Sequence, residues 1–154
     1  MSDRLMIRDI PVGGGAPVSI QSMTNVDSRD EKALLRQIRE LEDAGCEIIR
    51  ISVPDMQALE TFREVRKKTE SPLVADIHFD YRLAVGAIEA GADKVRINPG
   101  NIGSEDRVKA VVDAAKAARI PIRVGVNSGS LERIYWRNMV TSPQKRFARV
   151  LSGM

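Results

Sequence analysis

Five short runs of β-forming residues recur along this chain, and four of them alternate apolar with polar side chains. The runs occupy residues 17–22, 47–53, 72–79, 93–97 and 121–126. Stretches with apolar residues at helical spacing separate them, at residues 29–44, 56–69, 81–90 and 105–119. Strands that alternate with helices in this way predict βαβ units and a parallel sheet.

The alternation within each run distinguishes two parallel architectures. In the second run, Ile49, Ile51 and Val53 alternate with Arg50 and Ser52. An open doubly wound sheet is covered by helices on both faces, so both rows of its strands are apolar. In a barrel, one row faces the helices and the other faces a shared interior, which can be polar. The pattern therefore favours a (β/α)8 TIM barrel, whose active site lies at the carboxyl ends of the strands.

The chain is too short for a whole barrel. A complete TIM barrel needs about 250 residues and eight strands, whereas these 154 residues supply about five strands. We therefore predict an α/β fold: a partial TIM barrel with about five of the eight parallel strands, preceded by an N-terminal β-hairpin. The hairpin is expected to join residues 5–10 to residues 17–22 through a turn at Gly13, Gly14 and Gly15.

Composition and charge exclude several classes of protein. With 43% hydrophobic residues and one cysteine, Cys46, the chain is neither a disordered protein nor a disulfide scaffold. No apolar run approaches the roughly 20 residues of a membrane helix, and no signal-peptide pattern opens the chain, so a cytoplasmic protein is expected. The net charge of +3 originates in residues 133–154, where five side chains are basic and none is acidic.

Three arginines, Arg50, Arg96 and Arg123, occupy the polar rows of three different strands. Barrel geometry brings such residues to one mouth, where guanidinium groups repel one another unless an anion lies between them. The planar guanidinium binds phosphate through two parallel charge-assisted hydrogen bonds. Alternatively, each arginine pairs with a carboxylate or extends into solvent. The equivalent positions of the three residues favour a site for a substrate with two or more phosphate charges.

Asp76 and His78 lie two residues apart and therefore on the same face of their strand. The pair could orient a hydroxyl group or transfer a proton. One histidine and one aspartate are an incomplete set of metal ligands, so no metal site is predicted. The next strand leads into residues 98–103, a glycine-containing loop that suits either anion binding at the following helix or an ordinary βα turn.

Five segments are specific enough to indicate a family. They are residues 19–25 (SIQSMTN), 50–54 (RISVP), 73–81 (LVADIHFDY), 96–103 (RINPGNIG) and 123–132 (RVGVNSGSLE). In this order they resemble the N-terminal barrel of the bacterial 4-hydroxy-3-methylbut-2-enyl diphosphate synthases. The resemblance runs from about residue 4 to residue 132.

The resemblance implies an oxidoreductase of isoprenoid (terpenoid) biosynthesis. The family reductively opens 2-C-methyl-D-erythritol 2,4-cyclodiphosphate in the non-mevalonate (MEP) pathway. It uses an iron-sulfur 4Fe-4S cluster on a C-terminal domain, receives electrons from flavodoxin or ferredoxin, and forms homodimers.

Site residues follow from the same resemblance. Arg50, Arg96 and Arg123 match arginines that bind the cyclic diphosphate. The other matching pocket residues are polar, and we assign Asn98 and Asn127 to substrate binding and Asp76 and His78 to catalysis.

The chain departs from the family in its cysteines and in its last residues. The cluster needs three cysteines and a glutamate, but Cys46 is the only cysteine and lies within the barrel segment. The resemblance stops at residue 132, which divides the chain into a barrel part, 1–132, and a basic, non-homologous, poorly ordered tail, 133–154. A truncated form that carries part of the substrate site and is inactive in isolation is therefore expected.

Three alternatives stay open. Another anion-binding TIM-barrel enzyme, such as a pterin-binding synthase of the dihydropteroate type, would place its ligand at the same strand ends. The basic tail carries Tyr135, Trp136 and Phe147 and could contact nucleic acid, although an unordered terminus explains it more simply. A non-catalytic half barrel that dimerises through its open sheet edges is the third alternative.

Overall fold

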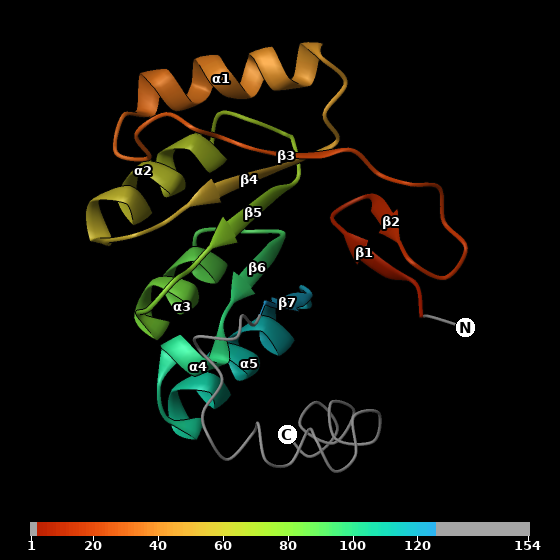
Figure 1. Cartoon of the computed structure of the whole chain (residues 1–154). Coiled ribbons are helices and arrows are strands. Elements are labelled where there is room, and N and C mark those ends of the chain that lie inside the picture. Colours follow the sequence, from red (N-terminus) through yellow and green to blue (C-terminus); the bar gives the residue numbers. More distant parts are fainter. Residues whose placement is uncertain (1–2, 126–154) are drawn as a thin grey trace.

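The computed structural model describes residues 3–125, in which five parallel strands form one curved sheet (Figure 1). The strands are β3 (Gln21–Met23), β4 (Ile48–Ser52), β5 (Leu73–Asp76), β6 (Lys94–Ile97) and β7 (Ile122–Val124). The connecting helices are α1 (Glu31–Asp43), α2 (Met56–Arg66), α3 (Tyr81–Glu89), α4 (Pro99–Ile102) and α5 (Glu105–Ala118).

The strands pair in the order β3-β4-β5-β6-β7, so each lies beside its neighbour in sequence. A doubly wound sheet reverses its strand order, whereas a barrel wall does not. The predicted partial TIM barrel is therefore confirmed, and within the described residues its wall does not close.

The apolar row of the strands packs against the helices, as the alternation predicted. This row consists of Ile49, Ile51, Val53, Leu73, Ala75, Ile77, Val95 and Ile97, each at most 1% exposed. The helices contribute Leu34, Phe62 and Val111, which are fully buried in the same cluster. Full burial of each large side chain stabilises the fold by roughly 1.5–3 kcal/mol. The polar row is consequently left for the other face of the sheet.

The N-terminal hairpin is present, but it forms earlier than expected. β1 (Leu5–Ile7) pairs antiparallel with β2 (Ile10–Val12), so the hairpin turn is at Arg8 and Asp9, and the glycine run forms a separate turn after β2. Arg8 takes the left-handed backbone conformation, with φ at 54°. The second partner expected for the hairpin, residues 17–22, instead leads into β3 of the parallel sheet.

The hairpin closes the amino end of the sheet on the face opposite the helices. Ile7 packs with Ile48, the first residue of β4, and Val74, the second residue of β5, in a second, smaller apolar cluster. Ile48 and Val74 alternate with the residues that face the helices, so they point into the barrel interior. The interior is therefore apolar at its amino end and polar toward the carboxyl ends of the strands.

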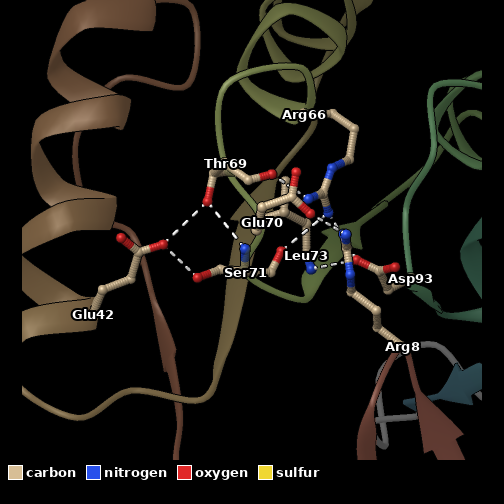
Figure 2. Close-up of polar contacts among 8 residues, drawn as sticks. All are labelled: Arg8, Glu42, Arg66, Thr69, Glu70, Ser71, Leu73 and Asp93. Atoms are coloured by element: carbon tan, nitrogen blue, oxygen red, sulfur yellow. Dashed lines mark hydrogen bonds and ion pairs between the residues drawn. The ribbon is translucent and has the colours of Figure 1, made fainter.

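A paired polar network surrounds this amino end (Figure 2). Arg66, at the end of α2, donates from Nη1 to Oδ2 of Asp93 at 2.9 Å. The same oxygen accepts the backbone N–H of Leu73 at 2.9 Å. Arg8 of the hairpin pairs with Glu70 in the loop before β5. These contacts connect the hairpin, α2 and the starts of two strands.

In the described part of the chain, no helix combines the length and apolar character that crossing a membrane requires.

Candidate functional site

The sheet register aligns four polar positions across neighbouring strands near their carboxyl ends. Ser52 pairs with Asp76, Asp76 with Arg96, and Arg96 with Arg123. Residues in register point to the same face of a sheet. These side chains therefore form one row across β4, β5, β6 and β7, on the inner face, and Arg50 lies one row below them.

Asp76 holds two of the predicted arginines. Its side chain is 1% exposed and accepts from Nε of Arg50 at 3.0 Å and from Nη1 of Arg96 at 3.1 Å. The two arginine side chains keep about a fifth of their surface exposed, at 21% and 20%. A buried carboxylate shared by two guanidinium groups fixes their orientation and leaves their remaining N–H groups available on the exposed side.

This arrangement bears on the two interpretations of the arginines that the sequence left open. The sequence favoured an anion between the arginines and left pairing with a carboxylate as the alternative, and in the structure Arg50 and Arg96 both pair with Asp76. The carboxylate alternative therefore holds for these two arginines. Arg123 differs, because its residue is exposed and makes no ion pair within residues 3–125.

His78 and Asn98 lie at the same carboxyl ends, in different environments. Nε2 of His78 is 3.7 Å from Oδ2 of Asp76, and its side chain is 43% exposed. Asn98 is 2% exposed, and its Oδ1 accepts the backbone N–H of Gly100 at 3.1 Å, which caps α4. The loop after β6 thus has the ordinary capped-turn structure that was one of its two interpretations. Asn127 lies outside the described residues.

Capping carboxylates fix the loops that surround the row. Asp55 caps α2 by accepting from the backbone N–H of Ala58 at 2.9 Å, and Asp80 caps α3 by accepting from that of Arg82 at 2.9 Å. Asp55 also pairs with Arg29 from the loop before α1. The hydrogen bond that Asp55 accepts from the backbone N–H of Ala58, and then the Arg29 guanidinium, lower the pKa of Asp55. These contacts hold the starts of both helices next to the strand ends.

Two positions near the row were not predicted as site residues. Lys94 precedes Arg96 by two residues on β6, so it shares the inner face, and its Nζ donates to Oε1 of Gln21 on β3 at 3.3 Å. Burial lowers the pKa of Lys94, and the charges of Arg123 and Arg50 lower it further. Its place in the polar row was the available signal.

Gly125 is the second such position. A Cβ built on it would lie 2.7 Å from Nε of Arg96, so the absence of a side chain leaves room for that guanidinium. A glycine in a polar strand row is the sequence signal for such a close approach.

The chain's residues do not fit an iron-sulfur cluster. Cys46 is the only cysteine of the sequence, and its thiol contacts the carbonyl oxygen of Ile48 at 3.2 Å, outside the row. Within residues 3–125, no three histidine, cysteine, aspartate or glutamate side chains gather where they could hold a metal ion.

The fold and this row define a parallel βα-barrel protein with basic side chains at the carboxyl ends of its strands. The family model described as the GcpE TIM-barrel domain matches residues 2–151. The chain belongs to this family.

Curated relatives carry one name, 4-hydroxy-3-methylbut-2-en-1-yl diphosphate synthase (flavodoxin). The Pseudomonas aeruginosa (strain LESB58) protein is 58% identical over 132 residues, which cover 86% of this chain and 36% of the relative. The protein of Marinomonas sp. (strain MWYL1) is 54% identical over 132 residues with the same coverage. The chain therefore spans 36% of the length of the curated relatives it matches.

Solved structures agree on the architecture. A dihydropteroate synthase from Xanthomonas albilineans in complex with 7,8-dihydropteroate superposes with a TM-score of 0.58 at 20% identity. The match covers 79% of this chain and 48% of that one. At this identity the likeness concerns the fold alone.

Proposed function

We propose that this chain supplies the substrate-binding barrel segment of a 4-hydroxy-3-methylbut-2-enyl diphosphate synthase. The substrate is 2-C-methyl-D-erythritol 2,4-cyclodiphosphate, which the enzyme opens reductively in the MEP pathway of isoprenoid biosynthesis. The relatives' shared name supports the reaction and flavodoxin as the electron donor, with ferredoxin as the alternative.

One observation carries the proposal: the pairing of Arg50 and Arg96 on the buried carboxylate of Asp76. The carboxylate holds both guanidinium groups in place before any ligand arrives, so little side-chain entropy is lost on binding. Arg123 stands in register beside Arg96 with no ion pair in the described part of the chain. A diphosphate would therefore meet two preorganised cations and one available cation.

The chemistry of ring opening suits this arrangement. Cleavage of a ring C–O bond places negative charge on the departing phosphate oxygen, and fixed cations stabilise that charge as it develops. We assign the diphosphate contacts to Arg50, Arg96 and Arg123. His78 beside Asp76 is the candidate for hydroxyl orientation or proton transfer, and Asn98 and Asn127 are further candidate substrate contacts.

The remaining features of the family lie beyond the residues of this chain. The reductive electrons require a 4Fe-4S cluster held by other residues, since one cysteine cannot hold it. We propose that the 154-residue chain binds substrate but does not turn it over, and that it works in a cytoplasmic homodimer as the family does. The expected basic tail, residues 133–154, lies outside the described residues, and the family model matches it as far as residue 151. Reductive ring opening by the purified, cluster-reconstituted chain would refute the proposed inactivity.

Isothermal titration of the 154-residue chain with the cyclic diphosphate tests the substrate site. Arg96→Met is expected to weaken binding by roughly tenfold to a hundredfold, because a charge-assisted hydrogen bond contributes about 1.5–3 kcal/mol. The control is Arg63→Met, since Arg63 lies on the surface of α2 and pairs with Glu60 at 2.8 Å. Equal affinity in the two variants, or tight binding of a pterin without binding of the cyclic diphosphate, would refute the proposal.

A further inference from the structure

Lys94 bridges the inner face of the sheet. Its strand, β6, is separated from β3 by two other strands, yet Nζ of Lys94 reaches Oε1 of Gln21 on β3 at 3.3 Å. Such a contact requires that the sheet curve so that the amine passes over the inner side of β4 and β5. Lys94 therefore projects into the barrel interior and not along its rim.

The groups that face this amine come from every neighbouring strand. They are Gln21 from β3, Arg50 from β4, Val74 from β5 and Arg123 from β7. Within residues 3–125, Lys94 makes no ion pair, and the carboxylate of Asp76 is shared by Arg50 and Arg96. The amine thus sits among cations without a carboxylate of its own.

Lys94 is half-buried, and its amine has the amide oxygen of Gln21 as a partner but no carboxylate, so its repulsion from Arg50 and Arg123 lowers the stability of the unliganded fold. If residue 94 only filled space, methionine or leucine would make the fold more stable than lysine, because the position lies next to the apolar cluster that contains Val74. A bound anion would explain a lysine at this position, because the anion supplies the missing counter-charge.

We propose that Lys94 is a positioning residue of the anion site, which places a fourth cation beneath the three arginines and favours dianionic over monoanionic phosphate ligands. This inference rests on the proposed function. Lys94 lies two residues before Arg96 on β6, so its amine is deeper in the barrel interior than the arginines. The negative charge of the ligand offsets the repulsion of the amine from Arg50 and Arg123.

The test compares the 154-residue chain with Lys94→Met and Lys94→Arg by titration with the cyclic diphosphate. At pH 7, Lys94→Met is expected to bind about tenfold more weakly, and Lys94→Arg to retain most of the affinity. The melting temperature of unliganded Lys94→Met is expected to rise. Lys109→Met is the control, because Lys109 is exposed on α5 and pairs with Asp113 at 2.5 Å.

The pH profile gives a readout that a packing role would not produce. Because the pKa of Lys94 is lowered by burial and by Arg123 and Arg50, its amine loses the proton at a lower pH than an exposed lysine. The affinity of the natural chain should therefore fall as the pH rises through that pKa, with net proton uptake on binding. The guanidinium of Lys94→Arg stays protonated, so its affinity should stay constant over this range.

Three results overturn the inference. Unchanged affinity in Lys94→Met, or identical pH profiles for the natural chain and Lys94→Arg, refutes the role of Lys94 while leaving the proposed function intact. Absence of cyclic diphosphate binding by the natural chain refutes both.

Discussion

The two ends of the sheet carry charge in opposite ways. At the amino end, Arg66 and Asp93 are paired one to one, with side chains only 11% and 15% exposed (Figure 2). At the carboxyl end, the carboxylate of Asp76 pairs with two arginines, and Arg123 makes no ion pair within residues 3–125. Lys94 lies one row below Arg96, level with Val74, and has no ion pair in this part of the chain either. The amino end is thus electrostatically complete, and the carboxyl end has an excess of positive charge.

This difference separates stability from binding in the same sheet. A complete buried pair contributes only to holding the fold, and its loss leaves an uncompensated charge. An incomplete cluster costs stability until a ligand of opposite charge arrives. Barrel enzymes in general place function at the carboxyl ends and stability at the amino ends of their strands, and the charges of this chain follow that division.

The largest effect is expected at the amino end. Asp93→Asn removes the carboxylate that faces Arg66, whose pKa burial already lowers, and leaves a buried cation without its partner. We expect the free energy of unfolding to fall by about 3 kcal/mol, measured by urea denaturation. Asp113→Asn, in an exposed helix pair with Lys109, should change it by less than about 0.5 kcal/mol. Similar losses in both variants would contradict the division between the two ends.

A smaller loss is expected from the equivalent change at the mouth. Asp76→Asn leaves Arg50 and Arg96 without their carboxylate, which should lower the free energy of unfolding by about 2 kcal/mol. Asp76→Asn loosens the two guanidinium groups but also removes a negative charge from beside the anion site, and we expect the change in charge to have the larger effect. The cyclic diphosphate should therefore raise the melting temperature of Asp76→Asn more than that of the natural chain.

Asp93→Asn provides the matched control for this rescue. Its unpaired arginine lies at the closed amino end, so the same ligand should raise its melting temperature no more than that of the natural chain. Equal rescue of the two variants would show that the mouth holds no specific anion site.

The sequence predicted which face each strand residue occupies, but not which charges meet. Alternation is a local property, so Arg50, Asp76 and Arg96 could be assigned to the inner face from their spacing alone. The sharing of Asp76 by two arginines depends on the register between neighbouring strands. Arg96 is 20 residues and Arg50 is 26 residues from Asp76 in the sequence, and the length of each helical crossover sets the register.

The hairpin shows a different limit of sequence interpretation. Three consecutive glycines are a strong turn signal, and all three take positive φ values in the structure. The tighter turn nevertheless forms at Arg8, a residue with no such preference, because pairing Ile7 with Ile10 places Ile7 in the apolar cluster with Ile48 and Val74. The glycine run also turns the chain, with the backbone N–H of Ala16 donating to the carbonyl oxygen of Gly13 at 3.0 Å, but burial of apolar surface decides which turn joins the paired strands.

The smallest change sharpens the comparison within the mouth itself. Gly125→Ala adds a methyl group about where the Arg96 guanidinium lies, since the added carbon would stand 2.7 Å from its Nε. The guanidinium is the far end of a flexible side chain, so it can shift and keep its ion pair with Asp76, but its N–H groups no longer point where the ligand binds. We expect roughly tenfold weaker binding of the cyclic diphosphate by titration, with little change in melting temperature.

Gly45→Ala is the control and should lower the melting temperature without weakening binding. Gly45 has open space around it but a φ of 87°, which strains alanine, and it lies away from the carboxyl ends of the strands. Weaker binding in Gly45→Ala, or a loss of stability without a loss of affinity in Gly125→Ala, would contradict the placement of Arg96 in the anion site.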